Sequence, residues 1–140
     1  PSAVSAAIRR NDLYRQWLSS GIWIYQTDFA ETSCISCMEA QAMGAIPLFS
    51  PVWAQGENTK FGVAIDGNPK DPLTNARFAA ELVRLALSED LQQALREKMM
   101  PYARQKYNWE RMVDLWEYKA GVKKDYPYDY PEELTNNDFR

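Results

Sequence analysis

The first apolar positions of the chain follow helical spacing, and short apolar runs come after them. The positions at helical spacing are Ile8, Leu13, Tyr14, Trp17 and Leu18. This spacing predicts a helix over residues 8–20 that ends at Gly21. The apolar and aromatic runs at 22–25 and 45–49 predict two short buried strands. Pro47 removes one backbone donor from the second run, so we expect that strand to be imperfectly paired or bulged there.

A further helix is expected between these two strands. Thr32 or Ser33 has the short polar side chain that favours an N-cap, and Gly44 favours an end just after Met43. A helix that connects two consecutive strands makes them parallel and packs on the sheet. Beyond the second strand, the pattern predicts a loop over 50–58 and a third short strand over 61–65.

The remaining chain is predicted to be helical before it changes character. Helical spacing predicts a helix over 74–87, a second one after a cap at Ser88, and a third over 109–119 after a cap at Asn108. Pro101 is expected to kink or break the second of these helices.

These elements predict an α/β fold. We expect a partial Rossmann-like domain over residues 1–120, with a short parallel sheet and helices on both of its faces. The acidic, aromatic and proline-rich residues 121–140 predict an extended arm. Four tryptophans at apolar spacing are expected in the core: Trp17, Trp23, Trp109 and Trp116. The short basic pairs Arg9-Arg10 and Lys123-Lys124 are expected to be solvated.

Composition narrows the classes of function. The 140 residues suit one domain, and 46% apolar with 13% aromatic residues exclude a disordered chain. A net charge of −3 argues against a nucleic-acid partner, and no apolar run is long enough to cross a bilayer. Histidine is absent, which excludes Ser-His-Asp and Cys-His machinery and the usual zinc nitrogen ligand. We expect no metal, no cofactor and a cytoplasmic location.

The segment from Asp28 to Gly44 carries the candidate chemistry. Glu31 follows the carboxyl end of a predicted strand, which is the edge where open α/β sheets bind ligands. The amides of Ser33, Cys34 and Ile35 at the helix start would hold an anion such as a diphosphate. Glu39 lies two turns along the helix, where a carboxylate can accept from the hydroxyls of a ribose. Spacing alone leaves a simpler interpretation open, in which Glu39 is a solvated helix residue or a salt-bridge partner.

A longer pattern surrounds these residues. The segment TDFAETSCISCMEAQAMGAIPLFSP resembles the E-x7-E region of retaining GT-B glycosyltransferases of family 4, the glycosyltransferase group 1 family. The resemblance extends from about Leu13 to Tyr118 and includes the Ala-Arg-x-x-Tyr-x-Trp pattern at 103–109. It implies a nucleotide-sugar-dependent transferase of the hexose-transferring type that needs no metal.

The resemblance also implies roles for single residues. Glu31 would contact the donor sugar as the catalytic glutamate, Ser33, Cys34 and Ile35 would bind the diphosphate, and Glu39 would bind the ribose. Thr32-Ser33-Cys34 departs from the Gly-Phe-Gly that often follows the first glutamate, which makes the loop stiffer.

The resemblance covers only part of the GT-B fold, and this limits the activity and the partners that we expect. The resemblance covers only the later part of the second GT-B domain, so we expect a donor-binding piece without the acceptor domain that is inactive alone. The alternative is a non-catalytic module that associates with itself and covers the exposed sheet edge and apolar surface.

Two further features leave alternatives open. Cys34 and Cys37 form a C-x-x-C pair at a helix start, the placement of a thiol-redox pair, although packing as small apolar residues is favoured. Trp53 follows the second strand and is interpreted either as lining a ligand crevice or as covering a sheet edge.

Overall fold

A computed structural model describes residues 8–126, and the chain divides into two compact units, one up to Ala103 and one from Arg104. The three strands are β1 (Ile22–Tyr25), β2 (Ile46–Phe49) and β3 (Val63–Ala64). The helices are α1 (Arg10–Ser19), α2 (Ile35–Met43), α3 (Ala54–Asn58), α4 (Pro72–Leu87), α5 (Glu89–Lys106) and α6 (Trp109–Lys119).

The strands form one parallel sheet in the order β1-β2-β3. β1 and β2 pair along their whole length, from Ile22 opposite Ile46 to Tyr25 opposite Phe49. β3 is shorter than the expected 61–65, and it pairs with β2 only at Leu48–Val63 and Phe49–Ala64. The prediction of a short parallel sheet is therefore confirmed.

Pro47 lies in the central strand without disturbing it. It is opposite Trp23 in an unbroken register, so the expected imperfect pairing or bulge is wrong. The N–H groups of Ile46 and Ser50 both donate to carbonyls on the β1 side, at 3.1 Å each. Because strand N–H groups alternate in direction, the nitrogen of Pro47 faces the other side, where β3 begins to pair only at the following residue. The absent donor thus falls where the ladder does not need one.

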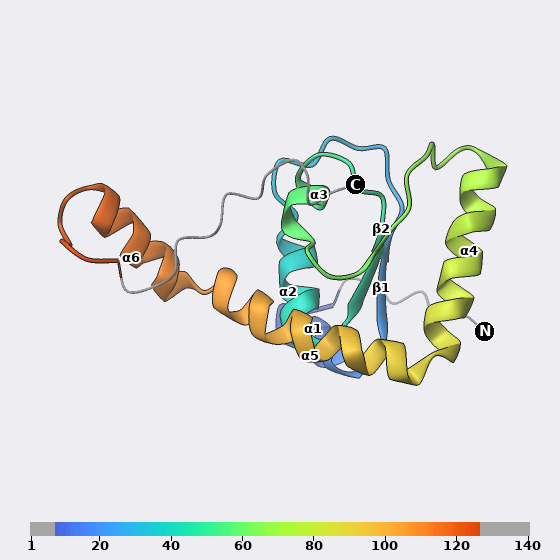
Figure 1. Cartoon of the computed structure of the whole chain (residues 1–140), viewed down its shortest axis with the longest axis horizontal. Helices are drawn as coiled ribbons and strands as arrows, with labels where there is room; N and C mark the ends of the chain where they lie inside the picture. The colour runs from blue at the N-terminus through green and yellow to red at the C-terminus, as the bar shows by residue number, and fades with distance from the viewer. Residues whose placement is uncertain (1–7, 127–140) are drawn as a thin grey trace. The chain divides into compact units, whose positions relative to one another are not determined.

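Helices cover both faces of the sheet, as expected. On one face, Ile46 and Leu48 of β2 pack in a core cluster with Phe78 and Leu85 of α4 and Met99 of α5. A second cluster joins α1 and α2 on the opposite face; its members and neighbours are Trp17, Ala40, Ala45, Leu13, Tyr14, Trp23 and Met43. Figure 1 shows β1 and β2 between α2 and α4. Trp17 is buried as predicted. Trp23 packs against this second cluster but is only partly buried, because β1 lies at an edge of the described sheet.

One arginine joins the amino ends of two strands. Arg96 of α5 donates from Nε to the carbonyl of Gly44 (3.0 Å) and from Nη2 to the carbonyl of Gly21 (3.2 Å). Gly21 directly precedes β1, and Gly44 lies two residues before β2. Gly44 also ends α2 with a left-handed φ of 95°, which confirms the predicted stop.

Two helical predictions need correction. The expected loop over 50–58 contains α3, a five-residue helix. Helix propensity does not predict it, because Gly56 is a poor helix former. α5 runs through Pro101, so the expected break is wrong, while the expected kink stays a prediction; a proline at this position removes one intrahelical bond. The ring is on the exposed side, while Met99 and Ala103 beside it are fully buried, so packing of the opposite face offsets the lost bond.

The second unit contains α6. Its predicted cap is confirmed, because the side chain of Asn108 accepts from the amide of Glu110 at 2.7 Å. The core assignment of Trp109 and Trp116 is wrong, since they are 75% and 59% exposed. Lys123 is not a free solvated cation, because it forms ion pairs with Asp114 and Glu117. The predicted arm falls largely on residues 127–140, which lie outside the described residues.

Candidate functional site

Two loops meet at the carboxyl edge of the sheet. One follows β1 and the other follows β2, and two hydrogen bonds join them. The amide of Thr27 donates to Oγ of Ser50 at 3.1 Å, and the amide of Ala54 donates to the carbonyl of Glu31 at 3.2 Å. The predicted sugar-contacting residue Glu31 therefore lies at the edge that the sequence indicated.

The carboxylate of Glu31 has one partner and one free oxygen in the described structure. The hydroxyl of Tyr25, at the end of β1, donates to Oε1 at 3.1 Å. Burial and this hydrogen bond raise the pKa of Tyr25, so its hydroxyl remains a donor at neutral pH. Among residues 8–126 none donates to Oε2 of Glu31. A half-buried carboxylate with a free oxygen is suited to accept from a hydroxyl.

The start of α2 is displaced from the predicted position. The N-cap is Cys34 rather than Thr32 or Ser33, and no side chain caps it. The carbonyl of Cys34 accepts from the amides of Cys37 (3.1 Å) and Met38 (3.2 Å), which closes the first turn. Of the predicted anion-binding amides, Ser33 thus precedes the helix, Cys34 is the cap and Ile35 is the first helical residue. The amide that continues this set into the first turn is that of Ser36.

The two cysteines are held by polar neighbours and both are free thiols. Sγ of Cys34 lies 3.3 Å from Oγ of Ser36. Cys37 is fully buried, and its Sγ lies 3.1 Å from Oγ1 of Thr59 and 3.4 Å from Nε2 of Gln41. Burial raises the pKa of the Cys37 thiol to about 12, which opposes formation of the thiolate that redox chemistry needs. The geometry favours packing over a redox role.

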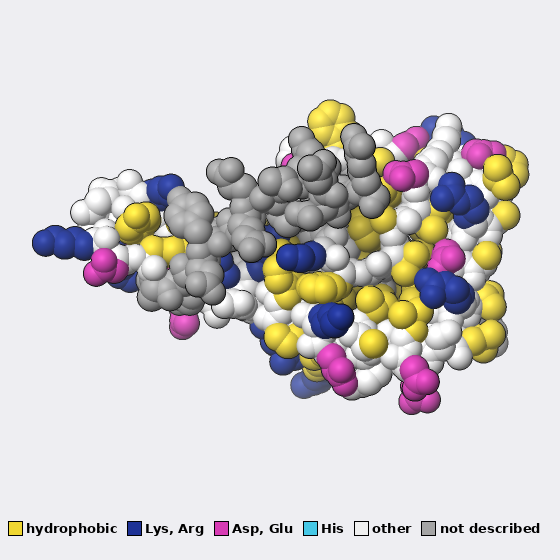
Figure 2. Space-filling model, in the orientation of Figure 1, with side chains coloured by type: hydrophobic (Ala, Val, Ile, Leu, Met, Phe, Trp, Pro, Cys, Tyr) yellow, Lys and Arg dark blue, Asp and Glu magenta, His cyan; other side chains and the backbone are white. Residues whose placement is uncertain are grey.

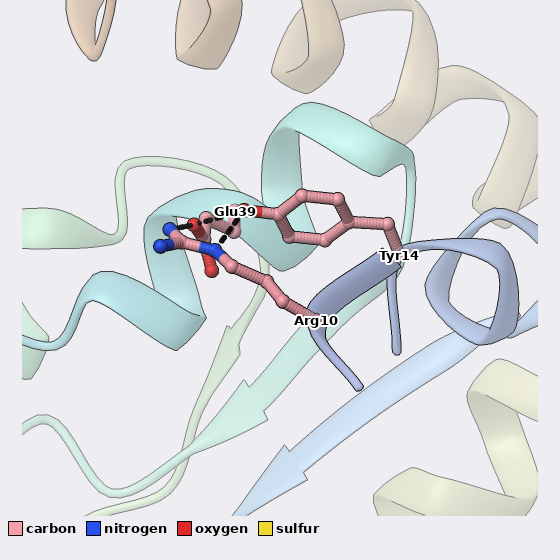
Figure 3. A network of polar contacts seen from close by, with 3 residues as sticks. All are labelled: Arg10, Tyr14 and Glu39. Carbon is pink, nitrogen blue, oxygen red and sulfur yellow. Dashed lines mark hydrogen bonds and ion pairs between the residues drawn. The ribbon is translucent and has the colours of Figure 1, made fainter. Parts of the chain in front are cut away.

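Glu39 is engaged by α1 (Figure 3). The hydroxyl of Tyr14 donates to Oε1 of Glu39 at 2.7 Å, and the guanidinium of Arg10 forms an ion pair with the same oxygen. Arg10 also donates to the Tyr14 hydroxyl and lies 5.5 Å from the centre of its ring. The hydrogen bond to the carboxylate raises the pKa of Tyr14, and burial adds to the shift.

This network corrects the expectation that Arg10 is merely solvated. The Arg10 side chain is 68% exposed, but that of Glu39 is only 22% exposed. The simpler interpretation of Glu39, as a salt-bridge partner, therefore describes a contact that exists. Arg10 and Glu39 are 29 residues apart in the chain, so no local pattern indicates the pair.

The two glutamates flank the start of α2 without sharing a contact. Glu31 precedes the cap by three residues, and Glu39 follows it by five, or roughly 7.5 Å of helix rise. Glu31 is bonded by Tyr25 of β1, whereas Glu39 is bonded by residues of α1. Glu31 thus lies at the carboxyl edge of the sheet, in the loop that leads into the cap of α2, and Glu39 lies further along the helix.

Charge over α4 is mixed rather than concentrated on the face that Figure 2 draws. Basic and acidic side chains are interspersed there. Within residues 8–126, no group of three or more cysteine, histidine or acidic side chains is placed to hold a metal ion. None of the described helices is both long and apolar enough to cross a membrane.

Comparison with known proteins adds no family to this geometry. No protein-family model matches the chain, and no curated protein matches its sequence.

Proposed function

We propose that the chain is the donor-binding part of a retaining glycosyltransferase that uses a nucleotide sugar. The observation that carries the proposal is the placement of Glu31 at the carboxyl edge of a parallel sheet, beside the amino end of α2. Glu31 contacts the sugar, and the amides at Ser33, Cys34 and Ile35 bind the diphosphate. A cytoplasmic location and a partner acceptor domain belong to the same proposal.

The start of α2 supports diphosphate binding through its backbone. The first amides of a helix have no intrahelical acceptor, and the helix dipole places partial positive charge at them. No side chain occupies the cap in the described structure, so these donors remain available to an anion. Each such dipole interaction contributes about 0.3–1 kcal/mol when exposed.

Glu39 supports the nucleoside half of the ligand. Its Oε1 accepts from Tyr14 and Arg10, and Oε2 accepts from no described side chain. That oxygen can accept from ribose hydroxyls while Arg10 neutralises part of the carboxylate's charge and places a cation near the phosphates. The competing view, a structural ion pair only, makes a different prediction for ligand binding.

Calorimetric titration tests these roles. Uridine, guanosine and adenosine diphosphates and inorganic pyrophosphate are titrated into the parent chain and into Glu39→Gln. We expect the variant to bind the preferred nucleotide about tenfold more weakly, because one charge-assisted hydrogen bond to ribose contributes roughly 1.5–3 kcal/mol. Binding of pyrophosphate is expected to change little, since the backbone amides survive the substitution.

The controls separate the possible failures. Glu31→Gln is expected to leave both affinities unchanged, because its partner is the sugar. Equal losses for nucleotide and pyrophosphate in Glu39→Gln would refute the ribose role and favour the structural ion pair. Absence of binding by the parent to every one of these ligands would refute donor binding by this chain.

A second candidate function rests on α6. Trp109 and Trp116 lie seven residues apart and are both exposed, which gives the helix an apolar stripe. We therefore keep a non-catalytic, self-associating module as the alternative. Sedimentation analysis distinguishes the two, because this alternative requires a dimer that Trp116→Glu dissociates.

A further inference from the structure

Trp53 combines a strained backbone with an exposed side chain. Its φ of 51° makes it the one non-glycine residue with positive φ among residues 8–126, and its ψ is −135°. A bulky residue in this region carries a conformational penalty that glycine avoids. The indole is 70% exposed, so burial of the ring does not repay the penalty within the described structure.

The strain arises from a specific turn. The amide of Gln55 donates to the carbonyl of Val52 at 3.1 Å, which closes a four-residue turn with Trp53 as its second residue. The φ and ψ of Trp53 are close to those of the second residue in a type II′ turn, a position at which glycine is strongly preferred. An exposed tryptophan at a glycine position therefore needs a reason other than folding.

The turn is attached to the candidate site. The amide of Ala54, the residue directly after Trp53, donates to the carbonyl of Glu31 at 3.2 Å. Ser50, at the other end of the same segment, accepts from the amide of Thr27 in the loop that carries Glu31. The backbone next to the indole is thus fixed to the backbone of the proposed sugar-binding carboxylate.

We propose that Trp53 stacks on the ring of the donor sugar beside Glu31, an inference that rests on the proposed function. A sugar ring presents hydroxyls at its rim and C–H groups on its face. Glu31 has a free oxygen for the hydroxyls, and an indole offers a rigid apolar plane for the C–H face. The sugar is favoured over the nucleobase because the turn is bonded to Glu31, and Glu39 is held separately by α1.

Three substitutions separate the ring from the strain. Trp53→Phe retains a flat ring, Trp53→Ala removes the ring but keeps a Cβ at positive φ, and Trp53→Gly removes both. Trp53→Gly is expected to unfold at a temperature about 3–6 °C above Trp53→Ala, because glycine relieves the strain. A lower unfolding temperature in both Trp53→Gly and Trp53→Ala than in the parent would show that the ring packs structurally and would overturn the proposal.

Ligand titration supplies the second measurement. Each variant is titrated with UDP-glucose and GDP-mannose and with UDP and GDP. Trp53→Ala and Trp53→Gly are expected to bind the preferred nucleotide sugar about tenfold more weakly than the parent. Both variants are expected to bind the matching diphosphate within twofold of the parent. Trp53→Phe is expected to retain most of the affinity for the nucleotide sugar.

The outcomes distinguish sugar stacking by Trp53 from the underlying proposal that the chain binds a nucleotide-sugar donor. Unchanged nucleotide-sugar affinity, or an equal loss for the diphosphate, overturns sugar stacking while donor binding stands. A parent chain that binds neither the diphosphates nor the nucleotide sugars refutes donor binding, and sugar stacking is refuted with it.

Discussion

Replacement of Gly62 by alanine tests how β3 is attached to the sheet. Gly62 directly precedes β3 and has a φ of +141°, a conformation that side chains rarely adopt. A Cβ at this position would lie 2.6 Å from the carbonyl oxygen of Pro47, closer than real Cβ atoms approach. Pro47 is fully buried in the central strand and is fixed in register with Trp23, so its backbone cannot move away.

The expected loss of stability in Gly62→Ala has three contributions. The unfavourable φ costs about 1–3 kcal/mol. Relief of the collision requires β3 to move, which weakens the 2.9 Å hydrogen bond from the amide of Ile65 to the carbonyl of Phe49. A hydrogen bond contributes about 0.5–1.5 kcal/mol, and partial exposure of the buried Ile65 adds about 1 kcal/mol. Gly62→Ala is therefore expected to lower the free energy of unfolding by about 2.5–5.5 kcal/mol.

Urea unfolding followed by circular dichroism measures this loss, with Gly44→Ala as the matched control in the same unit. Gly44 also has a positive φ (+95°), but its Cβ would meet only the flexible side chain of Met100, whose Sδ is the nearest atom at 3.1 Å. Gly44→Ala is expected to lose only about 1 kcal/mol. Equal losses in the two variants, or an unchanged midpoint in Gly62→Ala, would refute the argument that the Pro47 carbonyl sets the cost.

Four further predictions concern the thiols, activity and α6. Native Cys37 is expected to react with iodoacetamide at pH 8 at least about a hundredfold more slowly than in urea, because its pKa is raised to about 12; rapid disulfide exchange would contradict this. The Cys34→Ala, Cys37→Ala double variant is expected to fold and bind ligands nearly as the parent does. The purified 140-residue chain is expected to show no sugar transfer above a Glu31→Ala control, and turnover above that control would refute the expectation. Asn108→Ala is expected to destabilise α6 by about 1 kcal/mol by circular dichroism, whereas Asn108→Asp keeps the acceptor and is expected to be neutral.

The sequence predicts a helix or strand correctly where the residues of that element themselves determine its position. Apolar runs locate β1 and β2, Gly44 marks the end of α2, and Asn108 marks the start of α6. The start of α2 is predicted one or two residues early, because the argument assumes that a hydroxyl caps the helix and the structure uses none. Pro101 is overestimated as a breaker, since burial on the opposite face is a tertiary effect that propensity does not contain.

The candidate site is predictable in position but not in its contacts. The carboxyl edge of a parallel sheet and the start of α2 follow from topology, and Glu31 lies there. The pairing of Glu39 with α1 depends on how two helices pack, which spacing along one helix cannot reveal. Trp116 is predicted in the core but is exposed, because an amphipathic pattern identifies the apolar face of a helix without showing whether another element covers that face.

Arg96 has a consequence for how this fold tolerates change. Its guanidinium binds the carbonyls of Gly21 and Gly44 at the amino ends of the strands, away from the loops that hold the candidate site. Backbone carbonyls are present whatever the side chains, so this clamp is insensitive to replacements in those loops. Libraries that vary residues 27–33 are therefore expected to yield many folded proteins, while the same diversity around Arg96 is expected to yield few. The amino ends of the strands are thus held through backbone groups, while the side chains of the loops at the opposite edge are free to vary without loss of this support.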